Sequence, residues 1–171
     1  MMELIDICPL ETWATLENEI YEKSGLNPAV YDTEGVRINA NPRWPNRLCP
    51  QIKASSKGQS FICATAHMNL ANQARQERQP VIEECDAGMI KLVVPIFVGD
   101  NFLGTVGGCG QLLDDGEVDT FLVNKTTGLD EQQVALLAEG TSAITTAQAE
   151  SLAHFIAERV ASLVSNCRCQ Q

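Results

Sequence analysis

The chain has 171 residues, of which 44% are hydrophobic and 20% are charged, and its formal net charge is −10. This length suits one domain with a buried core, and we expect a single domain over residues 1–171. The negative charge argues against direct binding to nucleic acid or to an anionic membrane, because both need a basic surface. Without a membrane-spanning apolar run or a signal peptide, the sequence predicts a cytoplasmic protein.

The first predicted elements are a helix and a β-hairpin. Residues 9–24 have the apolar period of a helix, with Pro9 in its first turn and Gly25 just after its end. Its apolar face comprises Leu10, Trp13, Leu16 and Ile20. In residues 27–41, two short β-prone runs flank the turn sequence DTEG, so we expect a hairpin there.

The middle and the end of the chain alternate between predicted helices and strands. Three prolines make residues 42–58 irregular, with one short helix after Pro50. An alanine-rich helix over residues 59–79 should end before Pro80. Three strands follow, with a tight turn between the last two, and closing helices occupy about residues 117–165. The predicted strands cover residues 81–85, 90–98 and 101–111.

This order of elements predicts an α+β fold with one central antiparallel sheet flanked by helices. PAS and GAF sensor domains are built in this way, but a fold analogy alone does not give a function. The last predicted helix carries an apolar stripe with two possible roles: it covers the sheet, or it forms the two-fold interface of a homodimer. The stripe comprises Leu152, Phe155, Ile156, Val160 and Leu163.

Four of the seven cysteines are candidate metal ligands, in the pattern C-x13-C-x21-C-x23-C. We place each of them near the end of an element: Cys49 in an irregular loop, Cys63 early in a helix, Cys85 after a strand and Cys109 within GGCG. Side chains at element ends can converge on one site. No C-x2-C pair is present, so the spacing is not that of a zinc finger or a ferredoxin. The plain alternative is four buried cysteines that act as small hydrophobic side chains.

The glycines beside Cys109 favour a cofactor, because they let another group approach the backbone. Four thiolates suit either zinc or an iron–sulfur cluster. Structural zinc sites usually take two ligands from one tight turn, whereas these ligands are far apart in the sequence. We therefore expect an iron–sulfur cluster, preferably [4Fe–4S], on Cys49, Cys63, Cys85 and Cys109, with zinc as the alternative.

The remaining candidates have weaker support. His67 follows Cys63 by one helical turn and could assist the site, although such a histidine is more often at a helix surface. Cys8, Cys167 and Cys169 lie near the termini, and we interpret them as free thiols. A thiol enzyme would need a reactive cysteine with a resolving partner, and the sequence offers no C-x-x-C pair. We therefore predict that the protein is not an enzyme.

Residues 49–113 resemble the PocR ligand-binding domain family. The family has a cysteine before a short helix, a second cysteine opening a helix, a strand ending in Cys-His-Ala-Gly, a VPI strand and a final strand ending in Gly-Gly-Gln. The matching positions are Cys49, Gly58, Cys63, Cys85, Ala87, Gly88, Pro95, Ile96, Gly104, Gly107 and Gln111. The segment EIYEKSGLNPAVYDTEG also resembles the opening of the family.

The resemblance implies a PAS-like sensory fold that binds small hydrocarbon derivatives such as short diols. Ligand contacts are then expected at Gly108, Gln111, His67 and Asp86. Asp86 stands where the family has histidine, and Cys109 is an additional cysteine that completes a set of four. We expect a signal-transduction sensor of redox state or of a small ligand, which acts through a homodimer or a separate signalling protein. The alternative is a small-molecule binding module whose cysteines are structural or hold zinc.

Overall fold

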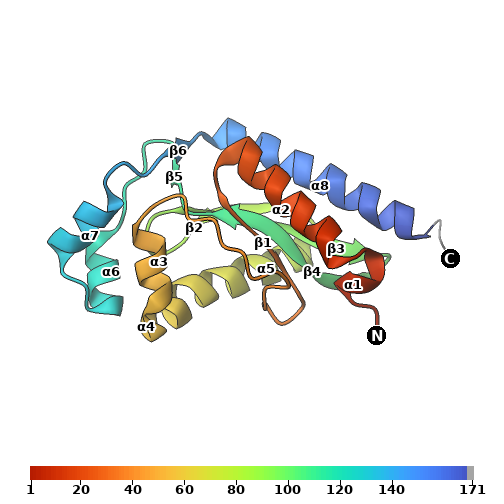
Figure 1. The fold of residues 1–171 in the computed structure, drawn as a ribbon, viewed down its shortest axis with the longest axis horizontal. Coiled ribbons are helices and arrows are strands. Elements are labelled where there is room, and N and C mark those ends of the chain that lie inside the picture. The colour runs from red at the N-terminus through yellow and green to blue at the C-terminus, as the bar shows by residue number, and fades with distance from the viewer. Residues whose placement is uncertain (169–171) are drawn as a thin grey trace.

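The computed structural model describes residues 1–168 and has the expected α+β architecture. A four-stranded sheet lies between two groups of helices, and both ends of the described chain lie at the same end of the molecule (Figure 1). The helices are α1 (Leu4–Ile7), α2 (Leu10–Ser24), α3 (Leu48–Ala54), α4 (Ser56–Gly58), the π-helix η1 (Gln59–Ala64), α5 (Thr65–Glu77), α6 (Thr120–Thr127), α7 (Glu131–Ala138) and α8 (Thr146–Arg168). The strands are β1 (Asn27–Tyr31), β2 (Val81–Glu84), β3 (Ile90–Val98), β4 (Asn101–Cys109), β5 (Leu112–Leu113) and β6 (Ala143–Ile144).

The main sheet is antiparallel, with the strand order β1-β4-β3-β2. The three predicted strands are therefore present, and β1 joins them beside β4. Residues directly opposite each other in an antiparallel pair point to the same face. Asn27 on β1 and Lys91 on β3 both lie opposite Cys109 on β4, so these three residues share one face of the sheet.

Helices α2 and α8 cover the opposite face of the sheet (Figure 1). The predicted helix over residues 9–24 is confirmed as α2, and its Trp13 is fully buried with its indole N–H donating to the carbonyl of Leu4 at 3.0 Å. The α8 stripe packs against the sheet within the monomer: Ile156 is fully buried, and Phe155 is partly buried. The stripe therefore covers the sheet, with Leu152, Ile156, Val160 and Leu163 buried within the monomer, and its role in a homodimer remains a prediction.

The predicted hairpin over residues 27–41 is only partly formed. Its first strand is β1, but its second strand is reduced to a single bridge between Tyr31 and Arg37. The turn itself is as expected, because the carboxylate of Asp32 accepts hydrogen bonds from two backbone N–H groups of the turn. After this bridge the chain crosses to α3 as an irregular segment.

Helix α5 and the segments before it pack on the face of the sheet opposite to α2 and α8 (Figure 1). The predicted helix over residues 59–79 is present but not uniform, because its first part is the π-helix η1. The short helix expected after Pro50 begins earlier, at Leu48, so Cys49 lies in a helix and not in an irregular loop. Pro50 is tolerated there because the N–H groups of a first helical turn need no helical partner.

The closing helices agree with the prediction over about residues 117–165, and they form two groups. Helices α6 and α7 pack beyond one end of the sheet, where Val123 and Val134 share a small core with residues of α3, η1 and the turn before β3. The two-residue strands β5 and β6 then pair in parallel and lead into α8. Asp114 joins this pair to α8 by accepting a hydrogen bond from the backbone N–H of Thr146 at 2.8 Å.

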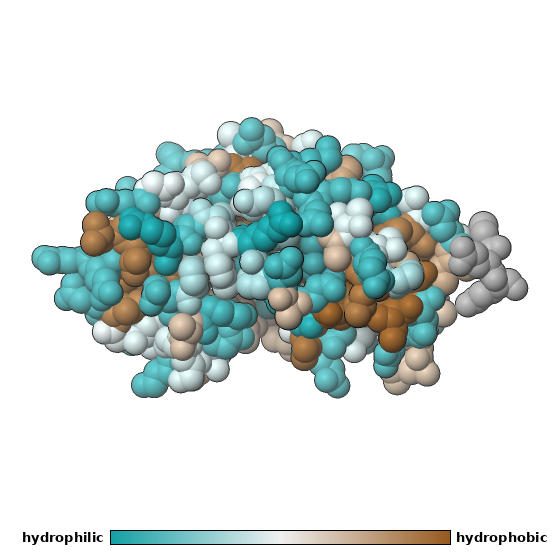
Figure 2. All heavy atoms as spheres, viewed as in Figure 1, coloured by the Kyte–Doolittle hydropathy of each residue, from teal (hydrophilic) through white to brown (hydrophobic). Residues whose placement is uncertain are grey.

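The surface is mostly polar on the face that Figure 2 shows, with apolar patches over α6 and α7 and near α1. The exposed large apolar side chains include Phe121 and Leu136 in the first region and Ile5 and Leu10 in the second. Within residues 1–168, no helix combines the length and the apolar character that crossing a membrane requires.

Candidate functional site

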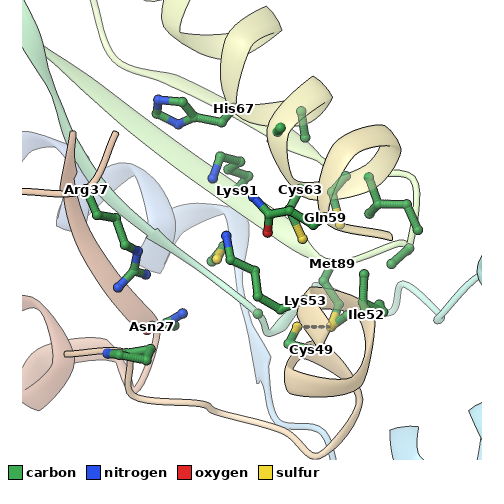
Figure 3. A pocket seen from close by; sticks show the side chains of 18 of the residues that line it. Asn27, Arg37, Cys49, Ile52, Lys53, Gln59, Cys63, His67, Met89 and Lys91 are labelled. Carbon is green, nitrogen blue, oxygen red and sulfur yellow. Dashed lines mark hydrogen bonds between the residues drawn. The ribbon is translucent and has the colours of Figure 1, made fainter. Parts of the chain in front are cut away.

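A cavity of about 380 Å³ lies between the sheet and the helical segments α3, η1 and α5. Its lining comes from β1, the segment after β1, these three helical segments, the turn after β2, and strands β3 and β4. Figure 3 shows the labelled side chains around it. A cavity of this volume is at the lower end of the range that holds small organic ligands.

All four cysteines predicted as metal ligands line this cavity. Cys49 comes from the first turn of α3, Cys63 from η1, Cys85 from the residue after β2 and Cys109 from the end of β4. Helix α3 and η1 bring the first two across the sheet face, and the turn that follows β2 positions the third. In that turn, the backbone N–H of Cys85 donates to the carbonyl of Met89 at 2.8 Å, and the carbonyl of Cys85 accepts from the N–H of Gly88 at 2.8 Å. The sequence thus identified residues that the fold brings together from four separate elements.

The buried thiols favour their neutral form. Burial raises the pKa of Cys49 far above its usual value, and the nearby thiol of Cys109 raises it further. Burial also raises the pKa of Cys63 and of Cys85. The positive charge of Lys53 partly offsets this effect at Cys63. Ionisation of Cys85 or Cys63 would likewise raise the pKa of Cys49.

Asn46 holds the Cys49 corner of the cavity in place. Its side-chain oxygen accepts hydrogen bonds from the backbone N–H groups of Leu48 and Cys49 at 2.8 and 2.7 Å, which fixes the start of α3. Its amide nitrogen donates to the carbonyl of Gly110 at 2.7 Å and to the sulfur of Cys49 at 3.2 Å. One side chain therefore ties α3 to the end of β4, where Cys109 lies.

The cysteines do not converge on a single point. Within residues 1–168, no group of three or more His, Cys, Asp or Glu side chains is arranged to hold one metal ion. The sulfur of Cys49 instead contacts the sulfur of Met89 at 3.7 Å (Figure 3). The cysteines share a cavity but are not assembled around one atom.

The glycines around Cys109 have a different role from the expected one. A Cβ atom at Gly107 would overlap the carbonyl oxygen of Leu92 on β3, and one at Gly108 would lie 2.9 Å from the Cβ of Leu26. Gly110 has a positive φ of 103°, and a Cβ there would meet the ring of Pro45 at 2.5 Å. These glycines therefore allow close packing against the protein itself and do not leave room for a cofactor.

His67, which was expected to contact a ligand, lines the cavity and is buried, and its ligand contact remains a prediction. Its ring stacks on Tyr31 with 3.8 Å between ring centroids. Burial, followed by the positive charges of Lys91, Lys53 and Arg37, lowers the pKa of His67 to about 3. The imidazole is therefore neutral at physiological pH, and its Nδ1 has no hydrogen-bond partner in the described part of the chain.

Three cationic residues of the lining were not identified from the sequence: Arg37, Lys53 and Lys91. Lys91 is buried in β3 on the cavity side, and its ammonium lies 5.4 Å from the centre of the Tyr31 ring. Burial lowers the pKa of Lys91, but the negative charge that Tyr31 and the thiols carry when ionised raises it, and the net direction is upward. A lysine inside the apolar strand sequence IKLVVPIFV was the available signal.

Three of the residues predicted to contact a ligand lie elsewhere. Asp86 is exposed on the turn after β2 and does not line the cavity. The amide nitrogen of Gln111 donates to the carbonyl of Ser24 at 2.7 Å, on the side of α2. Gly108 packs against Leu26. Ligand contacts at these three residues remain predictions, because none of the three lines this cavity.

The terminal cysteines lie away from the cavity. Cys8 and Cys167 are both partly buried against the α2–α8 core, and burial raises the pKa of Cys8 to about 11. The thiol of Cys167 donates to the carbonyl of Asp6 at 3.5 Å, so it is part of α8 packed near α1 and not of a frayed end. Cys169 lies outside the described residues.

An antiparallel sheet with a largely apolar, partly cationic cavity under its helices can hold a small ligand. In a comparison with known protein families, residues 6–168 match the family described as "Sensory domain found in PocR". The match spans nearly the whole chain, so the chain belongs to this family. No curated protein and no solved structure matches it.

Proposed function

We propose that the chain is a non-enzymatic sensory domain that holds an iron–sulfur cluster on Cys49, Cys63, Cys85 and Cys109. In this proposal the domain reports redox state or a small organic ligand to a signalling partner. The supporting observation is that four cysteines from four separate elements line one cavity. Cysteines that served only as small apolar side chains would have no reason to line the same cavity.

We favour a cluster over zinc because the four cysteines come from four separate elements, whereas a structural zinc site usually takes two ligands from one tight turn. Four sulfur ligands of one zinc ion lie about 2.3 Å from the metal and hence about 3.8 Å from one another. The described residues contain no group of side chains arranged in that way. A cluster distributes its thiolate ligands over several iron atoms, and its ligands can stand further apart.

The electrostatics of the cavity are compatible with a thiolate-bound group. Cluster binding must displace the thiol protons, because thiolates are the ligands. The positive charges of Lys53 and Lys91 lower the pKa of Cys63 and thus oppose the effect of burial. The hydrogen bond from Asn46 to the sulfur of Cys49 is of the kind that tunes bound clusters. When bound, such a cluster would supply a one-electron redox centre.

Anaerobic purification of the full chain tests this proposal. We expect brown protein with about four iron atoms and an equal amount of sulfide per chain. Cys63→Ser and Cys109→Ser should lose most of the iron, whereas Cys8→Ser, which lies outside the cavity, should retain it. A folded, colourless protein without metal would contradict the proposal. Stoichiometric zinc in place of iron would favour the alternative metal.

A ligand-binding module with structural cysteines is the second candidate. The observation that favours it is the cavity of about 380 Å³, whose lining includes apolar side chains such as Ile52, Ile62 and Met89. A thermal-shift panel of short diols, amines and organic acids on metal-free protein tests it. A ligand at 100 times its dissociation constant should stabilise the protein by about 2.7 kcal/mol. No shift across the panel would exclude this candidate.

We infer a cytoplasmic location, because all six cysteines of the described residues are free thiols and a reducing compartment keeps them so. The signalling partner is then a second copy or a separate protein. Since most of the α8 stripe is buried within the monomer, we propose that a homodimer would use another surface.

A further inference from the structure

Lys91 is the least expected side chain of the cavity, because its charge is buried without a carboxylate partner in the described residues. The residue is only 8% exposed. Glu83, its direct neighbour on β2, is exposed, and no carboxylate within residues 1–168 forms an ion pair with Lys91. Burying an unpaired charge costs several kcal/mol. An anion bound in the cavity would remove that cost.

Two further cations lie around Lys91. Arg37 from the segment after β1 and Lys53 from α3 line the same cavity, and Figure 3 shows both directed toward the space that Lys91 faces. Among the residues described, Glu34 is the one carboxylate of the lining, and it is exposed. The cavity is therefore positive in a protein whose net charge is −10.

The cavity also contains polar atoms that lack a partner. His67 is 4% exposed, and its Nδ1 has no hydrogen bond within the described chain. The same is true of the side-chain oxygen of Gln59. Figure 3 shows Gln59 and His67 on the same side of the cavity as Lys91. Buried polar atoms without partners are rare in proteins, so these are available for a ligand. Nδ1 of the neutral imidazole can donate to a carboxylate, whereas the Gln59 oxygen accepts and would pair with a donor elsewhere on the ligand.

The rest of the lining is apolar, and this restricts the ligand further. Ile52, Ile62, Ala87 and Met89 are almost fully buried, and the lining also includes Trp44, which is 38% exposed. We propose that the cavity binds a small organic monocarboxylate, with its carboxylate on Lys91 and near Arg37 and its apolar body against these side chains. The inference rests on the proposed sensory function of the cavity and names the class of ligand.

Calorimetry on the full chain tests this inference with pairs of probes that share a body but differ in charge. The acids are butyrate, hexanoate and benzoate, and the alcohols are 1-butanol, 1-hexanol and benzyl alcohol. We expect at least one acid to bind roughly 10- to 100-fold more tightly than its alcohol, because a charged hydrogen bond contributes that much. Equal affinities for the acid and the alcohol, or no binding by any acid, would overturn the inference.

Lys91→Met should remove the preference for the acid and leave the affinity for the alcohol unchanged. Lys125→Met, which changes an exposed lysine of α6 outside the cavity, should behave as the wild type. Lys91→Arg should recover most of the preference, since it restores the charge. A Lys91→Met variant that binds the acid as tightly as the wild type would overturn the inference. Where a variant does not fold, the comparison of acid and alcohol on the wild type still supports or overturns the inference.

Iron analysis of the same samples separates this inference from the proposed cluster. Protein that contains iron but binds no acid overturns the carboxylate inference alone, and the cations then serve to neutralise the thiolates. Protein that lacks iron but prefers the acid supports the carboxylate inference and contradicts the cluster. Protein with iron and a preference for the acid supports both.

Discussion

Replacing Gly107 by alanine should destabilise the sheet strongly, although its backbone is not in the left-handed region. An added Cβ would overlap the carbonyl oxygen of Leu92 on the neighbouring strand β3. Overpacking costs about 1–3 kcal/mol where side chains can shift. Here the obstacle is backbone in the middle of the sheet, so β3 and β4 must separate. We expect a loss at the upper end, about 3 kcal/mol or more.

The matched control is Gly128→Ala, which tests conformation without crowding. Gly128 has a positive φ of 79° and no atom within 4 Å of an added Cβ. Only the left-handed backbone then costs energy, about 1–2 kcal/mol. For a protein of this size the melting temperature falls by about 2–4 °C per kcal/mol. We therefore expect falls of about 6–12 °C for Gly107→Ala and about 2–8 °C for Gly128→Ala.

Thermal and urea unfolding of metal-free protein measures both variants. The metal must be absent, because the question is whether the glycine serves the fold or a cofactor. If Gly107→Ala unfolds like the wild type without metal but no longer binds iron, the packing explanation is wrong. The glycine would then serve the approach of the cofactor, as the sequence indicates.

Three other predictions concern the core, the pH response and the cavity wall. Ile156→Ala should lower the free energy of unfolding by about 2–5 kcal/mol without changing the mass by light scattering, whereas Glu150→Ala on the exposed side of α8 should do neither. Burial raises the pKa of Glu17, so the folded protein holds this proton more tightly and loses stability as pH rises above the usual glutamate value. Glu17→Gln should therefore be more stable than the wild type at neutral pH, with the difference vanishing in acid; a difference that grows in acid would contradict this. Asn46→Ala should cost about 1–3 kcal/mol in urea unfolding, because the backbone N–H of Cys49 and the carbonyl of Gly110 lose their partner, whereas Asn166→Ala on α8 should cost nothing measurable.

The regular elements were predictable because their signals are local. The apolar period of α2, with Gly25 at its end, needs no knowledge of the rest of the chain, and the apolar strands β3 and β4 are equally direct. Residues 112–113 and 143–144 were missed because a pair of two-residue strands has no periodicity to detect. The proline-rich segment was misleading at Cys49, since Pro50 permits a helix when it lies in the first turn.

The site was predictable only in part, because its chemistry depends on which face each residue occupies. The cysteines could be found by their residue type, and the cavity includes all four. Arg37 and Lys53 line the cavity because the chain between β1 and η1 crosses the sheet. No local sequence pattern predicts that crossing. The glycines near Cys109 were assigned to a cofactor because sequence alone does not show whether a close neighbour is protein or ligand.

The π-helix η1 sets the angular position of the cavity residues it carries. A π-turn holds one residue more than an α-turn, and such turns often occur at functional sites. Shortening residues 59–64 by one would let α4 and α5 run as a continuous α-helix, and the residues before the deletion would rotate by about 100° around its axis. Gln59, at the start of the π-turn, and His67, after it, therefore face the cavity together only while this extra residue is accommodated. The π-turn thus sets how α4 is rotated relative to α5 about the helix axis.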